Sequence, residues 1–203
     1  MTKKFFLFAF LILMTASGAF AQTVEQQVTK IRQLYVDTNK QIDEGLKDKT
    51  SGLHYAAWTI GGVRDGRQWS GVGTMHSTDE FYFDCEPGRI EECGADARKL
   101  VRKIVSSYTG AADLKTRNEY LFTKTGELVF VFTSELTNVG EDNIDVRKTA
   151  EQRFYFSKGK LIRVNRNGKN VDAKFTAEDL QKSKDTLAEA NRLRNIFALA
   201  FVE

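Results

Sequence analysis

The first clear pattern of apolar and polar residues predicts a long helix near the start of the chain. Between Glu25 and Lys49, apolar residues recur three, four or seven positions apart, with Lys, Arg, Gln and Asp between them. One such stripe on a polar helix is typical of a helix that packs on its own domain, and it is too short for a coiled coil. The stripe consists of Val24, Val28, Ile31, Tyr35, Ile42 and Leu46.

From Leu53 onward the apolar period becomes two, which predicts strands. Residues 53–63 and 68–76 flank Asp65-Gly66, a strong signal for a two-residue type I′ turn. Counting outward from this turn predicts that Trp58 faces Gly73, so that a large ring covers bare backbone. The same register places Ile60 opposite Gly71, Gly62 opposite Trp69, Ala56 opposite Met75 and His76 opposite Tyr55.

The middle of the chain predicts two hairpins of one design: an aromatic strand, a turn with glycine and an aliphatic strand. Because short turns join only neighbouring strands, the repeat predicts an antiparallel meander. A further turn at Asn167-Gly168 ends the series, and residues 138–146 form an acidic linker between the two hairpins. The hairpins join residues 119–122 to 128–132 across Thr125-Gly126, and residues 152–156 to 161–164 across Lys158-Gly159.

Two other segments contribute to the predicted sheet. Residues 79–84 carry three consecutive aromatic side chains and read as a strand. The apolar positions of residues 98–108 fit either one face of a helix or a strand that ends at Gly110, and we interpret the segment as a strand.

The chain ends in a second predicted helix. Thr176 and Asp179 resemble a capping box, although Asp is a poorer partner than Glu. The fold class is therefore α+β: an antiparallel β-meander of about six to eight strands, packed with a long N-terminal helix and a C-terminal helix. The predicted buried stripe of the last helix consists of Leu180, Leu187, Leu193, Ile196, Phe197 and Ala200.

The residues before the first helix predict export. Lys3 and Lys4 precede an apolar run, and Ala19-Phe20-Ala21 has the small-x-small pattern of a signal peptidase site. The apolar run is shorter than the roughly 20 residues of a spanning helix. We expect a signal peptide over residues 1–21, cleavage after Ala21, one α+β domain over residues 22–203, and a periplasmic or extracellular location.

Loss of the signal peptide also changes the charge. Removing Lys3 and Lys4 lowers the 30 basic residues to 28, against 27 acidic ones, a formal net charge of +1. Nucleic acids and anionic lipids are captured by concentrated basic faces, and the sequence shows none. We therefore expect no nucleic-acid partner, and no transmembrane segment in the mature chain.

Cys85 and Cys93 predict a structural disulfide, because an exported chain meets an oxidising compartment. A loop of about nine residues would stabilise the fold by about 2.5 kcal/mol. A redox pair would use Cys-x-x-Cys, and zinc would need two further ligands near these cysteines. We expect no metal and no cofactor.

The histidines offer weak evidence for catalysis. His76 shares a face of the predicted first hairpin with Ser70, which suggests a hydrolase couple. Ser70, however, lies in Trp69-Ser70-Gly71 rather than in a Gly-x-Ser-x-Gly elbow, and no acid is placed to orient His76. The acidic segments 91–92 and 141–145 lack the features of a calcium loop and read as solvated loops.

Aromatic residues beside glycines are the remaining candidates for a site. Aromatic walls with spare room can hold an apolar or sugar-like ligand, although the simpler interpretation is that these rings form the core. The candidate ligand-binding residues are Tyr55, Trp58, Trp69 and His76.

Parts of the sequence also resemble a known group of proteins. Residues 119–122 and 126–131, followed by residues 152–156 and 159–163, together with Ile31-Arg32-Gln33-Leu34-Tyr35, resemble a loose group of short exported bacterial proteins with no assigned activity. The likeness covers residues 24–165, without the Trp-rich first hairpin and the cysteine loop. It implies an exported α+β protein of a bacterial envelope and carries over no catalytic or ligand-binding residue.

Three functional hypotheses follow. The first is a non-enzymatic binding or interaction module that recognises another envelope protein or a small apolar ligand. The second is a secreted hydrolase whose site is assembled from distant residues, with His76 as base. The third is a structural protein that forms homo-oligomers through a sheet edge or the exposed face of its first helix. We favour the first, because no catalytic motif is visible and the strands are rich in aromatic residues.

Overall fold

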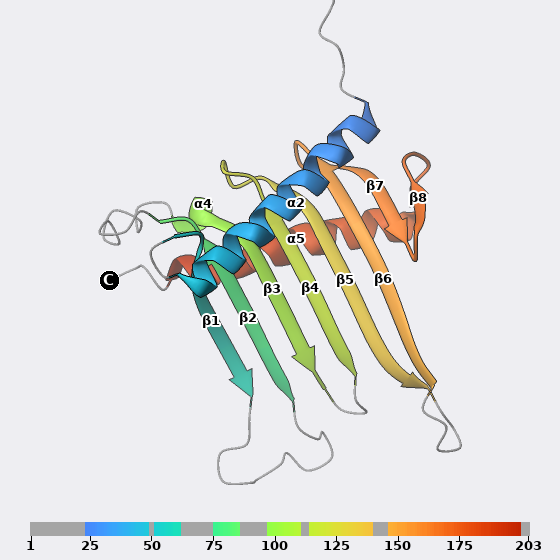
Figure 1. Ribbon diagram of the computed structural model, residues 1–203. Coiled ribbons are helices and arrows are strands. Elements are labelled where there is room, and N and C mark those ends of the chain that lie inside the picture. The colour runs from blue at the N-terminus through green and yellow to red at the C-terminus, as the bar shows by residue number, and fades with distance from the viewer. Residues whose placement is uncertain are drawn as a thin grey trace, which may run out of the picture.

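The fold has three layers, in which an antiparallel sheet lies between two long helices (Figure 1). The computed structural model describes residues 23–48, 51–61, 75–85, 97–110, 114–139 and 146–199. Eight strands follow one another in the sheet in the order in which they occur along the chain. The predicted α+β class, with a meander sheet and a helix at each end, is confirmed.

The first part of the chain forms α2 (Val24–Lys47), β1 (His54–Gly61), β2 (His76–Phe83), the short helix α4 (Ala97–Leu100), β3 (Val101–Thr109) and β4 (Lys115–Phe122). The second part forms β5 (Leu128–Val139), β6 (Val146–Ser157), β7 (Lys160–Arg166), β8 (Lys169–Val171) and α5 (Ala177–Leu199). Residues 98–108 are thus mainly a strand, as interpreted, with their first three residues in α4.

Helix α2 begins at a capping box. The backbone N–H of Gln26 donates to Thr23 Oγ1 at 3.2 Å, and the side chain of Gln26 accepts from the backbone N–H of Thr23. The predicted stripe is confirmed at Val28, Ile31 and Ile42, which are buried. Leu46 does not belong to the buried face, because its side chain is 59% exposed beyond the edge of the sheet.

The chain turns back from α2 into β1 through a close backbone contact. The backbone N–H of Leu53 donates to Gln41 O at 3.0 Å, which brings the start of β1 against the last turns of the helix. At Gly45 an added Cβ would lie 2.0 Å from Leu53 O, and Gly52 has φ +75°. Glycine at both positions allows this approach, because a side chain would meet backbone that cannot move aside.

Helix α5 begins at the predicted capping box. The backbone N–H of Asp179 donates to Thr176 Oγ1 at 3.1 Å, and the backbone N–H of Thr176 donates to Asp179 Oδ2 at 2.9 Å. Leu193 and Phe197 are buried as predicted, whereas Leu180 is 45% exposed, so the prediction for Leu180 was wrong. The helix instead faces the sheet with small or polar residues in its first half, and Ala200 lies outside the described residues. The buried residues are Asp179, Ser183, Ala190, Leu193 and Phe197.

The two later hairpins are confirmed, because the strands predicted to pair are paired. β4 pairs with β5, and β6 pairs with β7. The turn residues Lys158 and Gly159, and Asn167 and Gly168, all have positive φ. Two consecutive positive φ values are what a type I′ hairpin turn requires, so these short turns follow directly from local sequence.

The predicted first hairpin was wrong in its pairing. β1 pairs with β2, which places Trp58 opposite Asp79, Ala56 opposite Phe81 and Ile60 opposite Ser77. This pairing buries Phe81 under α5 and Tyr82 under α2, with exposed fractions of 2% and 8%. Burial of aromatic side chains on both faces outweighs the preference of a local turn. The turn at residues 64–67 and the strand over residues 68–74 lie outside the described residues.

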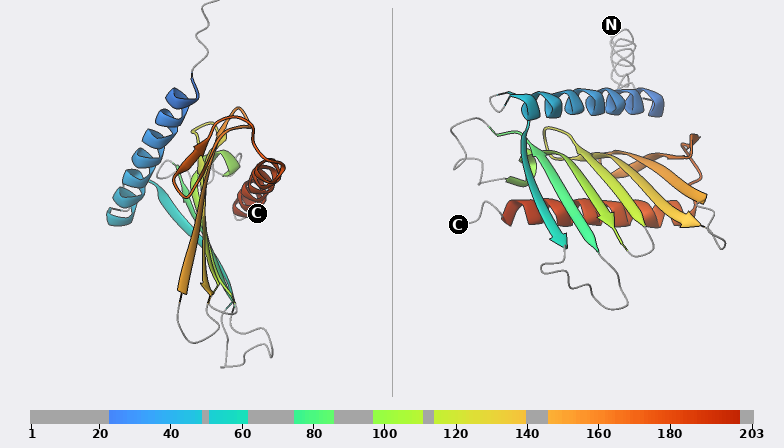
Figure 2. Two further views of the ribbon diagram at one scale, coloured as in Figure 1. Left: turned by 90° about the vertical axis from the view of Figure 1, so that its right-hand side faces the viewer. Right: turned by 60° about the horizontal axis from the view of Figure 1, so that its bottom comes forward.

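Each face of the sheet carries its own core. Under α5 the core includes Phe122, Phe154 and Phe156, which pack with Leu193 and Phe197 of the helix. Under α2 a smaller core contains Val28, Ile31, Leu121, Phe130 and Tyr155. Figure 2 shows that the sheet extends past both helices at one end of its strands. The helices therefore leave that end of each face uncovered.

We predict that Gly45→Ala destabilises the protein. Alanine normally favours a helix over glycine by about 1 kcal/mol, but here the new methyl group meets the backbone of Leu53. We expect the free energy of unfolding in urea to fall by about 1–3 kcal/mol. Thr29→Ala, on the exposed side of the same helix, serves as the control and should leave stability unchanged or slightly higher. A stabilised Gly45→Ala variant would contradict the close contact.

Candidate functional site

The residues predicted to bind a ligand do not form one cluster. Tyr55 stands opposite Tyr82 on the α2 face, whereas Trp58 stands opposite Asp79 on the α5 face. His76 stands opposite Gly61, so its predicted place opposite Tyr55 was wrong. Trp69 lies outside the described residues. A role in binding for each of these residues stays a prediction, but the described ones cannot share one pocket.

The histidines have structural contacts in the described part of the chain. His54 Nε2 lies 2.7 Å from the backbone oxygen of Cys85, and His76 Nε2 lies 3.2 Å from Thr78 Oγ1. Ser70 lies outside the described residues, so the Ser70–His76 couple stays untested. Cys93 also lies outside them, while Cys85 is buried beyond the end of β2, so their disulfide stays a prediction.

A groove with a volume of about 370 Å³ opens between α2 and the sheet. Its size falls within the range of roughly 300–1,000 Å³ that is usual for small-molecule sites. None of its residues was predicted as a site residue. It is lined by Ile31, Arg32, Tyr35 and Val36 of α2 and by Glu119, Phe130, Phe132, Arg153 and Tyr155 of the sheet.

The strand register assembles the sheet side of this groove. Phe130 stands opposite Tyr155, and Phe132 stands between Glu119 and Arg153 on the neighbouring strands. Residues two apart on a strand share one face, so all five side chains lie on the side that α2 covers. Successive side chains of each strand thus point alternately into this groove and into the core beneath α5.

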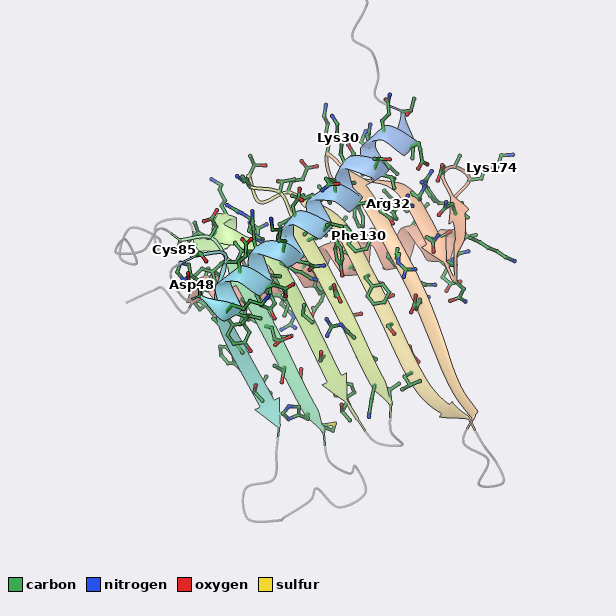
Figure 3. All side chains as sticks on the ribbon, in the orientation of Figure 1. Lys30, Arg32, Asp48, Cys85, Phe130 and Lys174 are labelled. Carbon is green, nitrogen blue, oxygen red and sulfur yellow. The ribbon has the colours of Figure 1, made fainter. Side chains whose placement is uncertain are left out.

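The floor of the groove is aromatic, and its walls carry two guanidinium groups. The ring centroids of Phe130 and Tyr155 lie 5.1 Å apart. The guanidinium carbon of Arg153 lies 5.1 Å from the ring centroid of Phe132, and that of Arg32 lies 5.9 Å from the ring centroid of Tyr155. Figure 3 shows Arg32 on α2 beside Phe130 on the sheet. The groove therefore joins an apolar surface to two positive charges.

An ion pair buried beneath α2 closes the polar end of the groove. Lys103 and Glu119 are 4% and 5% exposed, and Lys103 Nζ lies 2.7 Å from Glu119 Oε2. Tyr35 donates its hydroxyl proton to Glu119 Oε2 at 2.7 Å, and Arg117 Nε donates to Oε1 at 3.0 Å. Lys103 Nζ also donates to Asn39 Oδ1 at 2.8 Å. The network joins two residues of α2 to β3 and β4.

Glu119 is held as a carboxylate. Burial raises its pKa, but the hydrogen bond and charge of Lys103, the hydrogen bond from Tyr35 and the charge of Arg117 outweigh burial. The pKa of Glu119 therefore lies below its ordinary value. Both carboxylate oxygens accept hydrogen bonds, which makes Glu119 a poor general base and a good anchor for the helix.

The sequence carried a signal for this network. Lys103 lies between the apolar residues Val101 and Ile104, and Glu119 directly precedes Tyr120. A charge inside an otherwise apolar strand is rarely buried without a partner of opposite sign. That reasoning could have identified the pair, although not its partners on α2.

The two arginines of the groove have weaker partners. Arg32 lies 3.8 Å from Glu25, and both side chains are largely exposed. Arg153 donates to Glu151 at 2.9 Å, with both groups partly exposed. Exposed ion pairs of this kind contribute about 0–1 kcal/mol, so a bound anion can replace either carboxylate at little cost.

Other classes of site find less support. No cluster of three or more His, Cys, Asp and Glu side chains suited to a metal lies within the described residues. In the same part of the chain, no helix combines the length and apolar character needed to cross a membrane. Comparison with protein-family models, curated proteins and solved structures finds no match. The groove beneath α2 is therefore the site on which a functional proposal can be built.

A double-mutant cycle will test the buried ion pair. We predict that Lys103→Met lowers the free energy of unfolding by about 3–5 kcal/mol, because the buried Glu119 loses its buried partner and keeps only the exposed Arg117 as a cation. The double variant Lys103→Met with Glu119→Leu should be more stable than Lys103→Met alone, because no buried charge remains. Strictly additive losses in urea denaturation would contradict the coupling of the two side chains.

The same network predicts how stability depends on pH. Folding lowers the pKa of Glu119, so the ionised carboxylate stabilises the folded protein. This contribution to the free energy of unfolding is fully present above the ordinary pKa of 4.5, and it is lost as the pH falls through the lower pKa of the folded state. We expect the free energy of unfolding to fall less steeply below pH 4.5 in Glu119→Gln than in the unmodified protein. Glu135→Gln, an exposed control on β5, should keep the original slope.

Proposed function

We propose that the chain is an exported, non-enzymatic binding module that holds a small organic anion with an apolar body in the groove beneath α2. One observation carries the proposal: an aromatic floor is flanked by Arg32 and Arg153, whose guanidinium groups stack over rings of that floor. An apolar body would cover the rings, and a carboxylate would meet the guanidinium groups.

The ring contacts prepare both arginines for an anion. A guanidinium group over an aromatic face keeps its N–H edge available for hydrogen bonding, and it loses less rotational freedom on binding than an unconstrained side chain. Arginine donates two parallel hydrogen bonds to a carboxylate, so it recognises the shape of the group as well as its charge. Recognition at the rim of a water-excluding aromatic floor strengthens these charge-assisted bonds.

The shape of the groove favours a ligand of modest size. Its volume of about 370 Å³ lies near the lower end of the range of small-molecule sites. Glu119 at the polar end already accepts hydrogen bonds from Tyr35 and Arg117, so this end offers a ligand few free acceptors. Medium-chain carboxylates and small aromatic carboxylates match these constraints.

Export belongs to the same proposal. It rests on the basic and apolar residues at the start of the chain and on Ala19-Phe20-Ala21. Cys85 is buried beyond β2, a suitable place for a stabilising disulfide to Cys93 in an oxidising compartment.

One feature favours binding over the hydrolase hypothesis: His76, the candidate base, is not among the residues that line the groove.

The proposal predicts that octanoate binds more tightly than 1-octanol. The two ligands share an apolar chain and differ in charge, and a hydrogen bond to a charged group contributes about 1.5–3 kcal/mol. We expect isothermal titration calorimetry to show a Kd at least tenfold lower for octanoate.

The double variant Arg32→Met with Arg153→Met should remove that preference while binding of 1-octanol persists. Arg192→Met is the matched control, because Arg192 is an exposed arginine of α5 that pairs with an exposed carboxylate of Glu189. It should bind octanoate as the unmodified protein does. Equal affinity of both ligands for the unmodified protein, or an unchanged preference in the double variant, would overturn the proposal.

A further inference from the structure

A second groove lies on the opposite face of the sheet, between α5 and the strands β4, β5 and β6. Its volume is about 360 Å³. Its character differs from that of the groove beneath α2, because its walls carry amide and hydroxyl groups in place of arginines. The residues that line it include Thr116, Asn118, Thr133 and Gln152 of the sheet and Lys182 and Asp185 of α5.

Three of these side chains form a row across the sheet. Asn118 stands opposite Thr133, which stands opposite Gln152, so the three lie on neighbouring strands and on one face. Adjacent strands are about 4.8 Å apart, which sets the spacing of the row. All three are half-buried, and within the described part of the chain none of the three side chains has a hydrogen-bond partner. Their donors and acceptors are therefore available to a ligand.

Three charged residues line this groove: Lys182 and Asp185 of α5 and the exposed Glu135 of β5. Lys182 of α5 pairs with Glu178 at 2.9 Å, and Asp185 accepts a hydrogen bond from Gln181. Each charged group on the helix thus has a neighbour of its own. An amide both donates and accepts hydrogen bonds, and so does a hydroxyl, so the row suits a neutral ligand rich in hydroxyl groups.

Aromatic rings lie on the same face beside the polar row. Tyr108 of β3 stands opposite Thr116, which lines the groove. A Cβ added at Gly110 would lie 2.6 Å from the Tyr108 hydroxyl and 2.7 Å from its ring carbon Cε1. The ring therefore lies along the strand over Gly110, and the Tyr108 side chain is half-buried. Such a ring is a platform on which the apolar face of a sugar can stack.

Trp58 extends this surface to the edge of the sheet. It belongs to the same row as Asn118, since Trp58 stands opposite Asp79, Asp79 opposite Ser106 and Ser106 opposite Asn118. Three strand spacings separate Trp58 from Asn118, about 14 Å. The Trp58 side chain is 50% exposed. The row thus runs from an exposed indole, across Asp79, which is buried, and Ser106, to the amides of the groove. Tyr108 lies two residues along β3 from Ser106, on the same face.

From this arrangement we propose that the α5 face of the sheet, alongside the helix, binds a neutral oligosaccharide, which lies across the strands. Tyr108 and Trp58 stack against sugar rings, and Asn118, Thr133 and Gln152 bind the hydroxyl groups of the units in the groove. This site is separate from the anion-binding groove, because the two occupy opposite faces of the sheet.

Titration with three neutral tetrasaccharides, cellotetraose, maltotetraose and chitotetraose, tests the site. We expect at least one of them to bind with a Kd below about 1 mM and to change the tryptophan fluorescence of the protein. Tyr108→Ala, and separately Asn118→Leu with Gln152→Leu, should each weaken that binding at least tenfold. Tyr108→Phe keeps the stacking surface and should bind within about twofold of the unmodified protein.

The control variant is Arg153→Met on the other face, which should bind the tetrasaccharide unchanged. Thermal unfolding followed by circular dichroism shows which variants remain folded, and Tyr108→Phe supplies a readout if Tyr108→Ala does not fold. The proposal is overturned if none of the three sugars binds at about 10 mM. It is also overturned if binding persists in the folded Asn118→Leu/Gln152→Leu variant, or if Arg153→Met abolishes it.

Discussion

The ion pair between Lys103 and Glu119 determines how the first helix lies on the sheet. Burying two charges costs several kcal/mol per ion, and the pair returns this cost only with good geometry and further hydrogen bonds. Tyr35 and Asn39 of α2 supply those bonds, so the helix has one rotation and one position in which both charges are satisfied. An apolar stripe alone would allow the helix to slide along the sheet. Because Tyr35 and Glu119 also line the groove, the contact that fixes the helix shapes the candidate site.

Charged contacts also fix α5 and the N-terminal end of α2. Arg163 of β7 is buried and pairs with Glu25 at the start of α2. Arg166 of the same strand pairs with Asp179 in the first turn of α5. Both helices are thus anchored to β7 near their N-termini, and both cross the same end of the strands (Figure 2). The uncovered end of each face follows from this common anchoring, because neither helix can move toward that end without breaking a buried charge contact.

Local signals predicted most of the fold, because its turns and helix ends depend on neighbouring residues. Lys158-Gly159 and Asn167-Gly168 adopt the backbone that their sequence favours, and Thr176 caps α5. The pairing of β1 could not be predicted in this way. Asp65-Gly66 is a local signal, whereas the gain from burying Phe81 and Tyr82 depends on helices far away in sequence. The groove was missed for the same reason, because Arg32 and Arg153 come to line one groove only when α2 packs on the sheet. The charges of Lys103 and Glu119 were visible as exceptions within apolar strands, but their register was not.

The two faces of one sheet carry different grooves because strand side chains alternate. On β6, Arg153 and Tyr155 face α2, whereas Gln152 and Phe154 face α5. On β4 the same alternation sends Glu119 to one side and Asn118 to the other. One set of strands thus builds an aromatic groove with two arginines and a groove with a row of amide and hydroxyl groups, each closed by its own helix. The buried ion pair is formed before any ligand arrives, so the α2 groove is preorganised, and little of the binding free energy is needed to assemble it. In this fold the same few charges that position the helices keep both grooves open.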